Sequence, residues 1–181
     1  MADAYKLLSK ALTINKSFKD IFYYEYAQKC FKTALDYYPS NSPKLISYQM
    51  CLVSALQWRS INSDTFELRK AVLNDAYNLC IQSLKICLGV FGQNNFASAK
   101  IYRLLGSLFY YMEKDSESEI IHKKSLEILE NTLSKTNLHY LLAKSTLGVF
   151  YKMIGQINEA IVVLVEVAHV LSIFSFIFYF N

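Results

Sequence analysis

The side chains that could support catalysis or metal binding in this 181-residue chain are three histidines, four cysteines and one acidic cluster. No C-x-x-C pair and no Cys/His spacing typical of zinc occurs. Nucleophile-elbow, phosphate-loop and zinc-protease motifs do not occur in the sequence either. The sequence therefore predicts a protein that is not an enzyme, with no catalytic residue, no metal and no cofactor.

Each of these groups has a structural interpretation instead. Cys80 and Cys87 fall on one face of an expected helix, where buried thiols act as small hydrophobic side chains. His122 is expected to pack between helices, and His139 to be solvated near a helix start. The acidic residues within 113–119 suit the positive end of a helix dipole. Reduced thiols are typical of the cytoplasm, with the nucleus as the alternative, so we expect one of these locations.

The elements that must position any site are helices. Hydrophobic residues make up 53% of the chain, with only five Gly and two Pro, which suits helices joined by short turns. The formal net charge is +4. Lys and Arg are spread along the chain without a basic run, so we expect no nucleic-acid partner.

A repeat with a period of 42 residues sets the order of these helices. Gly106 returns as Gly148 and Phe109 as Tyr151, with a leucine before each glycine. A glycine inside a helix costs about 1 kcal/mol against Ala, so its recurrence indicates a close approach of two helices. We expect the first helix of each unit to carry this Leu-Gly pair. The residues predicted to pack the repeats together are Ala27, Phe31, Ala34, Ala76, Gly106, Phe109, Ser118, Gly148, Tyr151 and Ala160.

The predicted architecture is an all-α solenoid of antiparallel helical hairpins, because one hairpin cannot bury its apolar face alone. About four repeats cover residues 1–170, and an apolar tail outside the repeat pattern covers 171–181. Helices are expected over residues 4–12, 18–37, 43–58, 65–88, 95–112, 115–133, 138–154 and 157–174. Residues 60–65 are expected to form an inserted polar loop, and Gly155 to end a helix.

The spacing of Leu-Gly, aromatic and small residues resembles the tetratricopeptide (TPR) repeat. The residues at its signature positions are Leu105, Gly106, Phe109, Ser118, His122 and Ser125. The period exceeds the usual 34 residues, as in the longer repeats of kinesin light chains. The chain also resembles the amyloid protein-binding protein 2 family. The stretches that carry this resemblance are 75–79, 83–84, 91–92, 99–102, 105–106, 108–109, 112–114 and 121–125.

The family resemblance implies an adaptor that binds a protein or peptide. It further implies a substrate receptor of a cullin-2 RING ubiquitin ligase, with ligase components as partners, and links to microtubules and intracellular protein transport. In TPR arrays the first helices line a peptide groove, at positions filled here by Lys100, Arg103, Ser107, Tyr110, Leu142, Ser145, Val149 and Lys152. Lys100, Arg103 and Lys152 suit an acidic peptide or a chain-terminal carboxylate.

The apolar stretch 161–180 leaves three interpretations open. The first is a truncated or alternative C-terminus, and the second is a buried capping helix. The third is a tail anchor, which makes a membrane-tethered adaptor the alternative function. The charge of Glu166 within the stretch counts against this third interpretation, because a charge at the bilayer centre costs about 3 kcal/mol.

Overall fold

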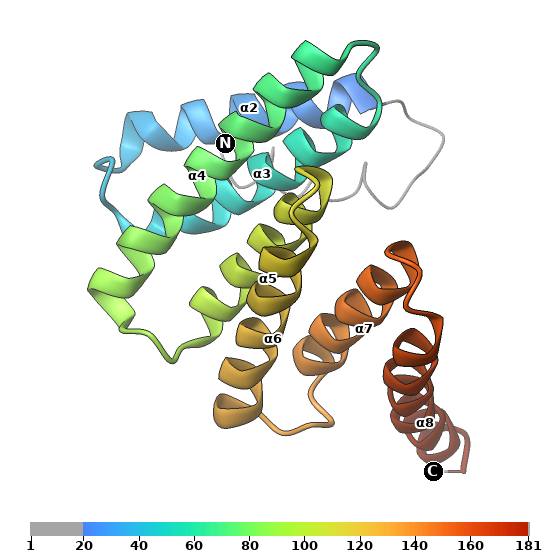
Figure 1. The fold of residues 1–181 in the computed structure, drawn as a ribbon. Coiled ribbons are helices and arrows are strands. Elements are labelled where there is room, and N and C mark those ends of the chain that lie inside the picture. Colours follow the sequence, from blue (N-terminus) through green and yellow to red (C-terminus); the bar gives the residue numbers. More distant parts are fainter. Residues whose placement is uncertain (1–19, 181) are drawn as a thin grey trace. The chain divides into compact units, whose positions relative to one another are not determined.

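The computed structural model describes residues 20–180, and the side chains of residues 23–173. This part of the chain contains seven α-helices, one 3-10 helix and no strand (Figure 1). The elements are α2 (Asp20–Tyr37), η1 (Pro43–Leu45), α3 (Ile46–Ile61), α4 (Phe66–Phe91), α5 (Phe96–Tyr111), α6 (Asp115–Thr132), α7 (Leu138–Met153) and α8 (Ile157–Phe180). They divide into two compact units, which meet between Gln93 and Asn94 in the sequence. The helix expected over residues 4–12 lies outside the described residues.

The first unit is built around α3, which packs against both α2 and α4. Its buried cluster contains Cys30, Ala34, Leu45 and Tyr48, with Phe31 against it. Ala27 and Ala76 are completely buried as well. Small side chains on α2 and α4 therefore lie in the interior of the first unit.

A buried hydrogen bond between two side chains fixes the register of the α3–α4 hairpin. The Ser83 hydroxyl donates to Gln49 Oε1 at 2.8 Å, and both side chains are fully buried. Gln49 Nε2 is the one buried polar side-chain atom without a partner among the residues placed in the structure. A polar pair in an apolar core favours one alignment of the two helices, because a shifted register would leave both groups unsatisfied.

The second unit consists of two hairpins, α5–α6 and α7–α8, with α6 also packed on α7. A Cβ placed on Gly106 would lie 2.8 Å from the His122 ring, and one on Gly148 would lie 2.7 Å from Leu164. Such distances are shorter than real Cβ contacts allow. The glycines therefore let each first helix lie directly against a large side chain of the second helix.

Two serine hydroxyls tie α6 to the backbone of α5. Ser118 donates to the Gly106 carbonyl at 2.8 Å and Ser125 to the Ala99 carbonyl at 2.7 Å. Both hydroxyls are completely buried. These bonds form only where the two backbones are close, so they depend on the absence of a side chain at residue 106.

The α3–α4 hairpin solves the same packing problem with different residues. Ser83 lies opposite Gln49 there, as Ser125 lies opposite Ala99 in the second unit. In this register Leu56 takes the place of Gly106, and Cys80 takes the place of His122. The expectation of a Leu-Gly pair in the first helix of each unit is therefore wrong for α3, which contains no glycine. By this alignment, α3 carries a large residue and α4 a small one at the two positions where α5 carries a small residue and α6 a large one.

Helix ends follow local side-chain chemistry. Thr65, Asn95 and Asn137 each accept a hydrogen bond from a backbone N–H in the first turn of α4, α5 and α7. Gly92 and Gly155 end α4 and α7 in positive-φ conformations of 76° and 82°.

Three expected boundaries are wrong, and one of them is the end of α4, which lies at Phe91 rather than at residue 88. The polar loop expected over 60–65 is shorter, because α3 continues to Ile61. Ser60 is buried and donates to the Gln57 carbonyl at 2.7 Å, which keeps the last turn helical. At the other end, α8 continues to Phe180 rather than ending at residue 174. Its sequence contains neither Gly nor Pro to stop the helix there.

The substitution Gly106→Ala tests the close approach of α5 and α6. We expect it to lower the free energy of unfolding by about 2 kcal/mol, because overpacking outweighs the gain in helix propensity. Gly89→Ala is the matched control, since a Cβ at residue 89 of α4 would meet nothing within 4 Å. In urea titrations, Gly89→Ala should raise the free energy of unfolding by about 0.5 kcal/mol. Equal effects of the two substitutions would contradict the close approach.

Candidate peptide-binding site

The predicted groove residues lie on α5 and α7, the two first helices of the second unit. On α5, Lys100 is exposed, while Arg103, Ser107 and Tyr110 are half-buried. On α7 the corresponding positions hold exposed Leu142, Val149 and Lys152 and half-buried Ser145. The spacing of these residues along each helix puts them on one face, because residues three, four and seven apart line up.

Ring contacts between α5 and α7 show which of these residues are level with one another. Phe96 and His139 meet with ring centroids 4.5 Å apart, and Tyr110 and Phe150 with centroids 6.1 Å apart. The two helices therefore run in the same direction with their starts and their ends side by side. Arg103 lies at the level of Ser145.

Lys152 is separated from this level along the helix. It lies seven residues beyond Ser145, or about 10 Å along the helix axis. It therefore falls at the level of Tyr110, whose ring packs on the buried cluster of Phe150 and Tyr151. One carboxylate cannot contact both Arg103 and Lys152, although an extended peptide is long enough to contact both.

Arg103 is the group in this set with the chemistry of an anion site. Its side chain is half-buried, and none of the ion pairs recorded for residues 23–173 includes it. None of its guanidinium nitrogens is among the fully buried side-chain atoms without a hydrogen-bond partner in that range. Burial lowers the pKa of Arg103, but a guanidinium stays charged in proteins.

His122 lies beside this arginine on the side of α6. It is 2% exposed, contacts the position of Gly106, and has its ring 5.6 Å from that of Phe150. Burial, followed by the positive charge of Arg103, lowers the pKa of His122 to about 4. The imidazole is therefore neutral at pH 7, and Arg103 carries the positive charge of this part of the surface.

The acidic cluster serves helix packing. Asp115 and Glu117 occupy the first turn of α6. The Glu119 carboxylate accepts a hydrogen bond from the Tyr151 hydroxyl at 2.9 Å and pairs with Lys123 at 2.7 Å. The hydrogen bond from Lys123 lowers the pKa of Glu119. These contacts connect α6 to α7 and leave Glu119 without the raised pKa of a general acid.

The cysteines are buried thiols and form no disulfide. Burial raises the pKa of Cys80 to about 12, so this thiol is not ionised at neutral pH. Among the described residues, no three His, Cys, Asp or Glu side chains come together as metal ligands.

The apolar C-terminal stretch is only partly described, because the side chains after Ile173 are not included. Within the described part, no helix combines the length and the apolar character that a membrane crossing needs. The tail-anchor interpretation of residues 161–180 stays a prediction. Membrane fractionation of the full chain against a version ending at Val170 would test it.

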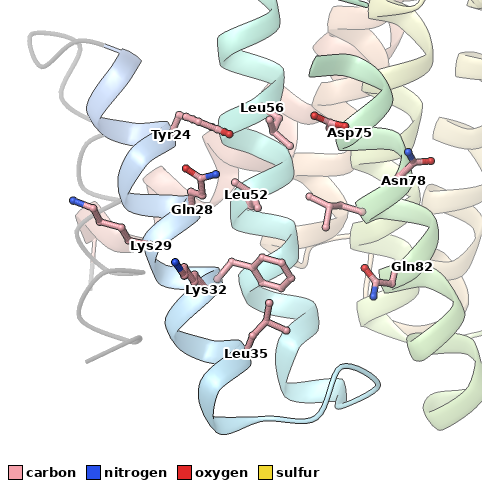
Figure 2. A pocket seen from close by; sticks show the side chains of 12 residues that line it. Tyr24, Gln28, Lys29, Lys32, Leu35, Leu52, Leu56, Asp75, Asn78 and Gln82 are labelled. Atoms are coloured by element: carbon pink, nitrogen blue, oxygen red, sulfur yellow. The ribbon is translucent and has the colours of Figure 1, made fainter. Parts of the chain in front are cut away.

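A second candidate surface, which the sequence did not indicate, lies in the first unit. A groove of about 720 Å³ runs between α2 and α4, with α3 as its floor (Figure 2). The TPR pattern predicts a groove only along the first helices of the repeats, whereas α2 and α4 are second helices. The leucines and amides that line this groove come from three different helices, and no sequence pattern marks them as one surface.

The lowered pKa of His122 predicts a pH dependence of stability. The unfolded state, with a histidine pKa near 6.5, binds more protons than the folded state below that pH. The free energy of unfolding should therefore fall by about 3 kcal/mol as the pH drops from about 6.5 to about 4. His122→Leu, which copies Leu164 opposite Gly148, should remove this fall, while His139→Gln at an exposed position should keep it. Identical pH profiles of wild type and His122→Leu would contradict this role.

No family model and no curated protein matches this chain. Among solved structures, BtubC (BKLC) from P. vanneervenii is similar over 96% of this chain and 64% of its own, with 17% identity and a TM-score of 0.66. This chain thus spans less than two thirds of the length of BtubC.

Two further structures are similar over most of their own length. A Podosopora anserina protein described as a putative kinesin light chain with nearly identical TPR-like repeats matches over 96% of this chain and 95% of its own, with 14% identity and a TM-score of 0.52. A thermophilic TPR protein from Thermus thermophilus matches over 94% and 90%, with 16% identity and a TM-score of 0.54. These structures confirm the predicted fold: the chain is an all-α TPR-like repeat protein.

Proposed function

We propose that this chain is a protein-interaction scaffold whose second unit binds a peptide carboxylate at Arg103. TPR-like folds generally serve as non-enzymatic scaffolds that bind protein partners, and the fold therefore supports the general part of the proposal. The observation that carries the specific part is the half-buried guanidinium of Arg103, which has no acidic partner among the residues described here.

The surroundings of Arg103 favour an anion over other ligands. Partial burial strengthens a charge-assisted hydrogen bond, because less water competes for the guanidinium. The planar guanidinium can donate two parallel hydrogen bonds to one carboxylate. Neutral His122 fills the space behind it without adding a counter-charge. An unpaired arginine that is already held in place by packing loses little entropy when a carboxylate binds.

The kind of partner is proposed from the sequence resemblance. The stretches within residues 75–125 that resemble the amyloid protein-binding protein 2 family support a substrate receptor of a cullin-2 RING ubiquitin ligase, or a role in intracellular protein transport. A receptor that binds C-terminal degrons would need a group that binds the terminal carboxylate, and Arg103 could be that group.

The location is proposed from the cysteines. Buried, reduced thiols are typical of proteins of the cytoplasm or the nucleus.

A library of C-terminal peptides, synthesised with free or amidated ends, tests the proposal on the full chain. We expect binders that need the free carboxylate, and we expect Arg103→Gln to weaken their binding by at least about tenfold, the usual worth of a charged hydrogen bond. Lys70→Gln, at an exposed position of α4, is the matched control for the loss of one positive charge. It should leave the affinity for these peptides unchanged.

Two results would contradict this assignment. One is a set of selected peptides that bind equally well with an amidated C-terminus and with a free C-terminal carboxylate. The other is equal affinity of wild type and Arg103→Gln for the binders selected from the library. Circular dichroism of the variant would show that its helices are intact.

A further inference from the structure

The groove of the first unit is a second candidate binding site, separate from Arg103. It is lined by one face of α2, by two residues of α3 and by one face of α4 (Figure 2). The lining residues of α2 extend from Tyr24 to Leu35, which corresponds to about 16 Å of helix. A stretch of about five extended residues has the same length.

The floor of the groove is apolar. Leu52 and Leu56 of α3 are 7% and 4% exposed and form its base. Half-buried Phe31 and Leu79 flank them from α2 and α4, and Leu35 is 42% exposed at one end. Water over such a floor is released when an apolar side chain covers it, which favours binding. The floor therefore fits one or two apolar side chains of a ligand.

The walls of the groove carry exposed carboxamides, with Gln28 on α2 and Asn78 and Gln82 on α4. A carboxamide offers a donor and an acceptor side by side, which match the C=O and N–H of a peptide backbone. An extended peptide has these backbone groups available, whereas a helix has already paired them internally. The carboxamide walls therefore favour an extended ligand over a helical one.

The two ends of the groove carry opposite charges. Asp75 lies with Tyr24 at one end, and Lys32 lies with Gln82 at the other (Figure 2). Neither Asp75 nor Lys32 belongs to an ion pair recorded for the described side chains. Asp75 and Gln82 are seven residues apart on α4, which separates the two ends by about 10 Å. That distance equals three or four residues of an extended chain.

We infer that this groove binds an extended peptide segment with a basic side chain at the Asp75 end and an acidic side chain at the Lys32 end. The two charged side chains lie three or four positions apart, and an apolar side chain between them rests on Leu52 and Leu56. The carboxamides bind the backbone in one direction, and the charges then determine which end of the segment carries the basic side chain.

The direction of binding can be tested with two synthetic peptides. One carries Lys, Leu and Glu at alternate positions with Gly and Ser elsewhere, and the other carries the same residues with Lys and Glu exchanged. Fluorescence anisotropy with the full chain should show tighter binding of one of the two peptides. The double variant Lys32→Glu/Asp75→Lys should reverse this preference, and each single substitution should weaken the preferred peptide by about tenfold.

One control variant shows whether the preference arises in this groove. Lys70→Glu on α4, outside the groove, should leave the peptide preference unchanged. Both peptides have amidated C-termini, so that they offer no terminal carboxylate to Arg103. Sedimentation of wild type and of the double variant should show the same molecular mass.

Equal affinity for both peptides would overturn the inference, as would a preference that the double variant does not reverse. A change of mass in the double variant would also overturn it, because the occupant of the groove would then be a second copy of the chain.

Discussion

The distance between the two helices of each hairpin is the constraint from which the other features follow. In the second unit, Gly106 and Gly148 bring a backbone against His122 and Leu164. This approach places the α5 carbonyls within reach of the buried hydroxyls of Ser118 and Ser125. The stability of the hairpin thus depends on matched sizes, because an added methyl group would push apart the helices that the hydroxyls join.

The same packing determines what the surface can bind. His122 fills the space opened by Gly106 and stays neutral because it is buried. The charged side chain of Arg103, one turn before that glycine, therefore lies beside the neutral, buried imidazole of His122. In the first unit, Gln49 and Ser83 fix the α3–α4 register, which puts Leu56 at the floor of the groove. Both candidate sites depend on how closely the helices pack beneath them.

Much of the fold could be predicted from the sequence, because helix starts and stops have local signals. The helix ends predicted from Asn95, Asn137 and Gly155 agree with those in the structure to within a residue or two. The packing of α3 could not be predicted, because Leu56 and Cys80 stand at the positions equivalent to Gly106 and His122, and these residues are common in any helix. The groove of the first unit was missed for a similar reason, since only the distance between α2 and α4 brings its leucines and amides together.

The coupling between Gly106 and His122 is the most direct measure of this close approach. A double-mutant cycle would combine Gly106→Ala with His122→Cys, which copies the small residue that α4 carries at Cys80. Unfolding free energies of the four proteins should show that the smaller side chain relieves the cost of the added methyl group, with a coupling of about 1–3 kcal/mol. Strictly additive effects would contradict the claim that matched sizes at this contact hold the two helices together.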